Sequence, residues 1–304
     1  MDRAALAWVA VAMFAVAPPL FAEQTGGDTT AVGDWSVAAD LNITLTQNAY
    51  SDNWAGSELG AISWALNHNA LAQSQLTDKL HTKNTLRLAF GQTHSQRVDE
   101  KDGTKYWDRP SKSTDIVDLE TVLRFTYGWF VDPFAAGRAE TQFLDETDAG
   151  RKRYLNPVKL TESVGIARVF IKEDSREWTA RLGTAFRQHI DRDVLDEVSQ
   201  TRETVTVNDG GVDFVTEFRT PLADDRITFT SRLQAYKALF SSEDEDSPSE
   251  DWAATDLEWQ NTFTASITPY LMVNLYLEFL YDKEIVDDVR FKETLSLGFT
   301  FKLI

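Results

Sequence analysis

The sequence predicts an all-β fold: an antiparallel transmembrane β-barrel of about twelve strands, of the outer-membrane kind. Three observations predict it. Segments of about ten residues alternate apolar and polar side chains, the connections between them alternate long and short, and aromatic residues gather where the segments end. A strand of this kind shows lipid only at every second residue, so a mean hydropathy of −0.33 does not argue against membrane insertion.

The first 22 residues have the pattern of a secretory signal peptide. Arg3 precedes an apolar run from Ala4 to Ala17, two prolines follow, and the small residue Ala22 suits a cleavage site. The run is shorter than the roughly 20 residues that a membrane-spanning helix needs. We therefore expect residues 1–22 to be removed and residues 23–304 to form one barrel domain in the outer membrane of a Gram-negative bacterium.

Five segments alternate cleanly, and weaker ones lie between them. The clean segments are 35–46, 117–127, 257–267, 271–279 and 295–303. In the last of these we expect Leu297 and Phe299 to face lipid, and Ser296 and Thr300 to face the interior. The weaker segments are 59–72, 82–94, 134–143, 160–171, 177–189, 211–220 and 226–237. Together they make about twelve strands, an even number as in bacterial single-chain barrels.

Segment 160–171 breaks the alternation. Glu162 and Arg168 share a face with Val164, Ile166 and Phe170. Because charges on the lipid face are unfavourable, we expect a bulge or an error of register in this segment.

The connections divide into two classes. The long ones are 46–58, 95–113, 144–159, 190–210 and 238–251, and the short ones lie near 77–78, 132–133, 173–174, 221–225 and 268–269. Long external loops and short periplasmic turns are typical of outer-membrane barrels, and this assignment places both chain ends in the periplasm.

Aromatic residues at the strand ends predict two girdles at the membrane interfaces, in preference to the core of a soluble sandwich. Those near the short turns are Trp35, Trp129, Phe130, Phe134, Trp178 and Tyr270, and those toward the long connections are Tyr50, Trp54, Tyr106, Trp107, Tyr154, Trp252 and Tyr281.

One segment carries a family resemblance. Asn53-Trp54-Ala55-Gly56-Ser57-Glu58, within Gln47–Glu58, resembles the Asn-Trp-x-x-Gly-Gly-Glu signature of an uncharacterised bacterial outer-membrane β-barrel family, known only as a domain of unknown function. Thr141-Gln142-Phe143 and the stretch Pro157–Ile166 resemble other recurrent parts of that family, although Ser57 stands where the family more often has glycine. The resemblance covers most of the mature chain and implies an outer-membrane barrel of unassigned activity.

Composition excludes several kinds of chemistry. The net charge of −18 argues against nucleic acid as a partner, and the absence of cysteine rules out disulfides and thiolate sites. None of His68, His81, His94 and His189 lies in a nucleophile elbow or a zinc motif. The acidic clusters of the long connections lack calcium-loop spacing. We therefore predict no catalytic residue, metal or cofactor, although His94 and His189 near the outer strand ends keep a lipid-modifying enzyme as an alternative.

The polar strand faces predict a charged interior of mixed sign. The inward residues are Asp40, Arg87, Asp118, Glu120, Arg124, Arg138, Glu140, Arg181, Arg187, Asp213, Glu217, Arg232, Glu258 and Glu278. Hairpin counting across the turn at 221–225 places Asp213 opposite Arg232. Unpaired charges in a low-dielectric interior are costly, so these groups must pair or face water.

Two structures fit such an interior: a narrow aqueous pore or an ionic plug. The leading hypothesis is porin-like passage of small solutes, with outer-membrane lipids and small polar solutes as partners. The alternatives are a lipid-modifying enzyme and a plugged surface-binding or structural barrel.

Overall fold

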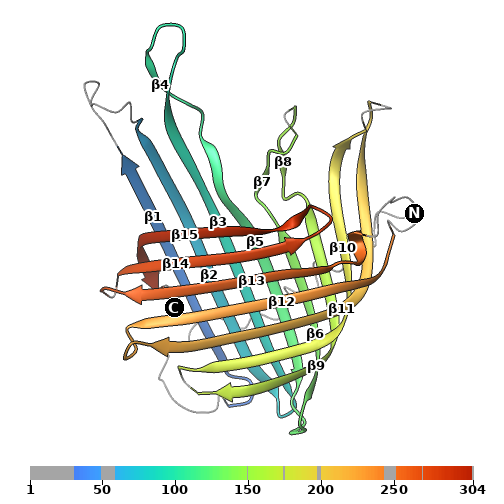
Figure 1. Ribbon diagram of the computed structural model, residues 1–304. Helices are drawn as coiled ribbons and strands as arrows, with labels where there is room; N and C mark the ends of the chain where they lie inside the picture. The colour runs from blue at the N-terminus through green and yellow to red at the C-terminus, as the bar shows by residue number, and fades with distance from the viewer. Residues whose placement is uncertain are drawn as a thin grey trace.

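Twelve long strands close into one antiparallel barrel, as the sequence predicts (Figure 1). The computed structural model describes residues 31–48, 59–148, 150–173, 175–196, 200–242, 251–268 and 270–302. Each ring strand pairs with its neighbours along the chain, and pairing of the first strand with the last closes the ring.

The ring strands are β1 (Trp35–Asn48), β2 (Ala61–Thr77), β3 (Leu80–Val98), β5 (Ser111–Phe125), β6 (Asp132–Thr141), β9 (Val158–Lys172), β10 (Glu177–Leu195), β11 (Arg202–Leu222), β12 (Ile227–Ser241), β13 (Thr255–Ser266), β14 (Leu271–Asp282) and β15 (Val286–Lys302). The connections also contain β4 (Lys105–Trp107), β7 (Leu144–Asp145), β8 (Arg153–Tyr154) and the 3-10 turn η1 (Asp251–Ala253). No helix in the described part of the chain is long and apolar enough to cross a membrane.

Each of the twelve predicted segments lies in one ring strand, apart from a residue or two at some of its ends, but several connections are shorter than predicted. Residues 190–210 were expected to be a loop, whereas β10 continues to Leu195 and β11 begins at Arg202. The reason is that strands continue beyond the bilayer, where hydrogen bonding persists and apolar alternation is no longer required. Residues 283–285 alone join β14 to β15. This connection is short where the alternation of long and short connections would require a long one.

The structure differs from the prediction at two residues near the short turns, Asp132 and Phe134. The connection between β5 and β6 spans 126–131, so Asp132 begins a strand instead of forming a turn. Phe134, expected in a girdle, is 4% exposed and faces inward, because it shares a strand face with Asp132 and Arg138. Segment 160–171 has a bulge between Val169 and Ile171, where the pairing with β10 shifts. The bulge lies beyond Glu162 and Arg168, so both residues keep the strand face of Val164 and Ile166.

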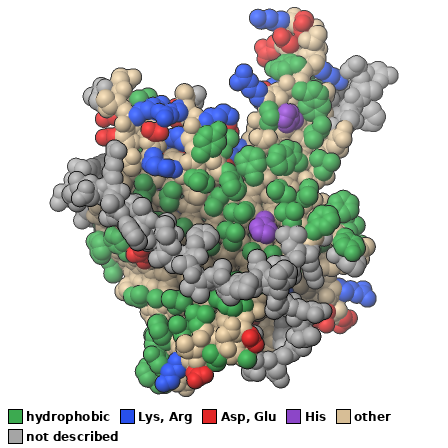
Figure 2. Space-filling model, turned by 180° about the vertical axis from the view of Figure 1, so that it is seen from behind, with side chains coloured by type: hydrophobic (Ala, Val, Ile, Leu, Met, Phe, Trp, Pro, Cys, Tyr) green, Lys and Arg blue, Asp and Glu red, His purple; other side chains and the backbone are tan. Residues whose placement is uncertain are grey.

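The outside of the barrel is apolar and the inside is polar. Leu297 and Phe299 are exposed on the outer face, as predicted, with Leu297 at 57%; the side chain of Thr300 is outside the described set. Buried polar side chains, including Glu120, Arg138 and Asp213, lie on the opposite strand faces. Figure 2 shows apolar side chains spread over the barrel wall, with charged ones mostly toward its two ends. This arrangement is the reverse of that in a soluble protein and is the one a lipid-embedded barrel requires.

Aromatic rings form a continuous row at the end of the barrel that carries the short turns. The ring of Phe170 stacks on Trp178 at 4.5 Å, and contacts continue through Phe218 and Phe229 to Phe263 at 4.7 Å. The row therefore crosses five neighbouring strands, β9 to β13. Tyr50 and Trp54, predicted for the other girdle, lie outside the described residues.

Candidate functional site

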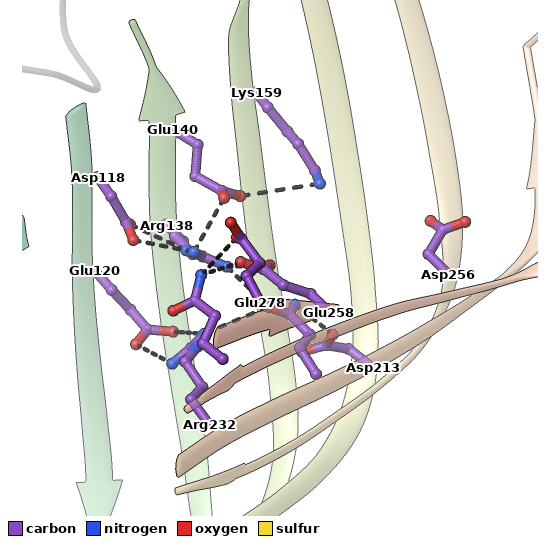
Figure 3. A network of polar contacts seen from close by, with 12 residues as sticks. Asp118, Glu120, Arg138, Glu140, Lys159, Asp213, Arg232, Asp256, Glu258 and Glu278 are labelled. Atoms are coloured by element: carbon purple, nitrogen blue, oxygen red, sulfur yellow. Dashed lines mark hydrogen bonds and ion pairs between the residues drawn. The ribbon is translucent and has the colours of Figure 1, made fainter. Parts of the chain in front are cut away.

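The candidate site is the interior of the barrel, where side chains from opposite walls meet (Figure 3). Glu120 is on β5 and Arg232 is on β12, the fourth and ninth strands around the ring from β1. Directly opposite strands of a twelve-strand ring are six places apart, and these two are five apart. Arg232 Nη1 nevertheless lies 3.2 Å from Glu120 Oε2, so this ion pair crosses the interior.

Arg232 is the centre of a first group of charges, the Arg232 cluster: Lys83, Glu120, Arg181, Glu217 and Arg232. Its guanidinium also pairs with Glu217 at 2.7 Å, and Lys83 Nζ reaches the other oxygen of that carboxylate at 2.8 Å. Arg181 pairs with Glu120. Each carboxylate of the cluster therefore has two cationic partners, and the cluster carries one net positive charge.

Arg138 is the centre of a second group, the Arg138 cluster: Arg87, Asp118, Arg138, Glu140 and Glu258. Arg138 Nε and Nη2 each donate to one oxygen of Asp118 at 3.0 Å, the two-pronged geometry that guanidinium and carboxylate favour. Glu140 lies 3.0 Å away, Glu258 on β13 lies 3.7 Å away, and Arg87 reaches Asp118 at 3.8 Å. The cluster carries one net negative charge.

The remaining predicted residues have separate partners. Asp213 accepts a hydrogen bond from Gln234 at 2.8 Å, Glu278 accepts one from Gln260 at 3.4 Å, and Arg187 pairs with Asp256 at 2.8 Å. Arg124 lies apart from both clusters and pairs with Asp132 at 3.7 Å. Gln234 accepts hydrogen bonds from both Arg138 and Arg232 and so joins the two clusters into one polar network, whereas Arg187–Asp256 and Arg124–Asp132 are separate pairs.

The predicted pairing of Asp213 with Arg232 is wrong. In the β11–β12 register Arg232 faces Glu217, and Asp213 faces Tyr236. The error arises because the turn lies further along the chain than expected: β11 continues two residues beyond the predicted end, to Leu222, which pairs with Ile227, so residues 223–226 form the turn. Moving the centre of a hairpin changes every cross-strand partner.

Sequence reasoning missed Lys83, Lys159, Gln234, Asp256 and Gln260 as members of the network. The signal that could have found them is strand parity, because residues an even number of positions apart along a strand lie on the same face. Lys83 is four positions from Arg87 on β3, and Asp256 and Gln260 are each two positions from Glu258 on β13.

A cavity of about 200 Å³ lies beside the Arg138 cluster. Its charged lining residues are Arg87, Asp115, Asp118, Arg138, Glu140, Glu258 and Glu278. The cavity is below the roughly 300–1,000 Å³ of ordinary small-molecule sites.

The histidines form no catalytic arrangement in the part of the chain that the structure describes. His68 bonds the backbone oxygen of Asp40 at 2.9 Å, and no histidine there hydrogen-bonds a serine hydroxyl or a carboxylate. His94 pairs in register with Ile62 and His189 with Lys159. No group of three or more His, Asp or Glu among these residues could hold a metal ion.

Comparison with known proteins gives only distant likenesses. No family model matches the chain, and no curated protein matches it. The Asn53–Glu58 segment that resembles the uncharacterised family lies outside the described residues, as does the predicted signal peptide, 1–22.

Among solved structures, an outer-membrane channel from Pseudomonas putida F1 is similar at 16% identity and a TM-score of 0.39, covering 91% of this chain and 98% of that one. The β domain of the Bordetella autotransporter BrkA is similar at 12% identity and a TM-score of 0.34, covering 89% of this chain and all (100%) of that one. Pseudomonas putida OprB is similar at 8% identity and a TM-score of 0.26, covering 88% and 92%.

Proposed function

We propose that this protein is an outer-membrane channel that passes small polar solutes through a narrow, charged lumen. The observation that carries the proposal is a closed twelve-stranded barrel whose outer face is apolar and whose interior is lined by charges of both signs. Lipid on the outside and water on the inside satisfy both surfaces. The predicted signal peptide would bring the chain to this membrane, with the short turns in the periplasm.

The ion pairs set the size of what can pass. Contacts such as Glu120–Arg232 and Arg138–Glu258 join strands on nearly opposite walls, so the open cross-section is divided into small passages. Solutes of the size of hydrated ions fit such passages, whereas sugars of several rings do not. The Arg232 cluster carries one net positive charge and the Arg138 cluster one net negative charge, so their fields largely cancel. We therefore propose that the channel distinguishes only weakly between cations and anions.

Planar-bilayer recording of the refolded mature chain tests the proposal. We expect discrete, small conductance steps, and larger steps for Arg232→Gln, which removes a side chain that spans the lumen. Arg151→Gln is the matched control, because the Arg151 side chain is 53% exposed in a long connection and its ion pair among the described residues is with Asp193. A silent bilayer from protein shown to be folded would remove the channel proposal.

A second candidate function is a plugged barrel with a surface-binding or structural role. The same contacts favour it, because ion pairs that bridge a lumen can close it completely. The recordings separate the two: a plugged barrel is silent as wild type and conducts only when Arg232 or Arg138 is replaced. Lipid-hydrolysis assays on the same sample test the remaining alternative, a lipid-modifying enzyme.

A further inference from the structure

Arg168 lies on the outer, apolar face of the barrel. It pairs in register with Ala180, and the neighbours on its face of β9 are Val164, Ile166 and Phe170, all strongly exposed. Six arginines on the inner face, by contrast, all form ion pairs: Arg87, Arg124, Arg138, Arg181, Arg187 and Arg232. Arg168 forms no ion pair with any carboxylate of the described residues.

The position of Arg168 along β9 is at the end with the short turns. Its Nη1 donates to the backbone oxygen of Phe130, in the turn between β5 and β6. Its guanidinium carbon lies 3.7 Å from the centre of the Phe130 ring and 5.5 Å from that of Phe170. Phe170 in turn stacks on Trp178. This is the aromatic row that marks the level of lipid headgroups in a membrane barrel.

The guanidinium is held in place, and no carboxylate of the described residues neutralises it. Arginine has five N–H donors in a planar fork, and among the described residues the bond to Phe130 is the one hydrogen bond that it makes. The Phe130 ring, itself 78% exposed, restrains the guanidinium by cation–π contact and leaves the fork available from the lipid side. Such a fork matches the oxygens of a phosphate group.

We infer that Arg168, with the rings of Phe130 and Phe170, binds the phosphate of a phospholipid headgroup in the leaflet at the short-turn end. The charge complements phosphate. The apolar side chains of Val164 and Ile166 continue from the site toward the middle of the membrane, where they accommodate the acyl chains of the same molecule. A free anion would use the guanidinium and none of this apolar surface. The inference requires insertion in a bilayer and does not depend on whether the lumen conducts.

Native mass spectrometry of the folded, full mature chain in detergent tests the inference. The probes are phosphatidylglycerol and a diacylglycerol with the same acyl chains but no phosphate. We expect wild type to bind phosphatidylglycerol more tightly, and Arg168→Gln to weaken that binding about tenfold, as loss of a charge-assisted hydrogen bond predicts. Phe130→Leu keeps the charge and removes the ring, so it should weaken binding by a smaller factor.

Arg176→Gln is the matched control. Arg176 lies in the turn after β9 and pairs with Glu173 at 3.7 Å. The change therefore removes one positive charge at the same end of the barrel and leaves Arg168 and the rings of Phe130 and Phe170 unchanged. Phosphatidylglycerol binding should be unchanged. An equal loss in this variant, or no loss in Arg168→Gln, would overturn the inference.

Two further arms keep the test decisive. Inorganic phosphate at the concentration of the lipid should not displace phosphatidylglycerol; displacement would identify a free-anion site instead. Each variant is first shown to fold by heat-modifiable migration. If Arg168→Gln does not fold, Arg168→Lys replaces it, because lysine keeps the charge but lacks the planar fork. If the single variants Arg168→Lys and Phe130→Leu both bind phosphatidylglycerol as tightly as wild type, the inference is contradicted.

Discussion

Replacement of Arg138 by methionine should destabilise the barrel more than any replacement of an exposed arginine. The guanidinium is 8% exposed and bonds both oxygens of Asp118 at 3.0 Å, while Glu140 and Glu258 lie at 3.0 and 3.7 Å. Without it, Asp118 keeps Arg87 at 3.8 Å, and Glu140 keeps Lys159 at 4.0 Å.

The magnitude follows from this loss. Breaking a buried pair by removing one partner costs about 3–5 kcal/mol, because a carboxylate then lies in a low-dielectric interior without its main cation. Three carboxylates lose their main cation here, but the residual partners limit the effect, so we expect a fall of about 3–5 kcal/mol in the free energy of unfolding. The measurement is urea unfolding of the protein refolded in lipid vesicles, followed by tryptophan fluorescence and by gel migration.

Arg151→Met is the control for this prediction. Arg151 pairs with Asp193 at 3.3 Å, and both side chains are about half exposed. An exposed pair contributes roughly 0.2–1 kcal/mol, so the control should unfold almost as wild type does. A loss below about 1 kcal/mol for Arg138→Met would show that water screens the interior pairs as it screens surface pairs, and would refute the reasoning from burial.

Two other perturbations test the wall and the external connections. Leu297→Arg should impair assembly, because arginine on the lipid face costs roughly 2–4 kcal/mol near the midplane; Ser296→Arg, on the inner face, should assemble, and equal yields of heat-modifiable protein would show that the faces are misassigned. In the β6–β9 connection burial pushes the pKa of Asp145 upward, but hydrogen bonds from Thr147 and Asn156 and the charge of Arg153 outweigh it and hold the pKa below 3.8. The ionised form is therefore favoured by folding, and its contribution is complete above about pH 4 and lost as pH falls below 3.8. Protection of residues 144–156 from hydrogen exchange, corrected for the intrinsic pH dependence of the exchange rate, should fall over that range in wild type. Asp145→Asn should lack this loss of protection, and its persistence there would assign the effect to another group.

The face that each strand residue occupies could be predicted from the sequence with few errors. Leu297 and Phe299 lie outside. All fourteen residues proposed for the interior, from Asp40 to Glu278, have partners among other polar side chains of the barrel. Parity is a local property, since neighbouring side chains of a strand point to opposite faces whatever the rest of the chain does. The exception is Phe134, which was expected in a girdle although it has the same parity as Arg138 and Glu140, both expected inside.

Strand ends and hairpin registers could be predicted less well. The alternation that indicates a strand is imposed by lipid, so it ends at the membrane while hydrogen bonding continues, as β10 and β11 show beyond residue 190. Arg232 was assigned to Asp213 instead of Glu217 for the same reason: an error in the strand ends moves the centre of the hairpin and every pair counted from it.

The sequence by itself determined that this chain forms a barrel of about twelve strands with an apolar outside and a charged inside, because period-two alternation and the lengths of the segments are both readable along the chain. Only the tertiary structure decided which charges meet. Glu120 and Arg232 are 112 residues apart and on nearly opposite walls, and their contact depends on how the sheet closes, tilts and staggers. The contact of Arg168 with Phe130 was likewise decided in three dimensions, because it depends on the β5–β6 turn lying beside the outer face of β9.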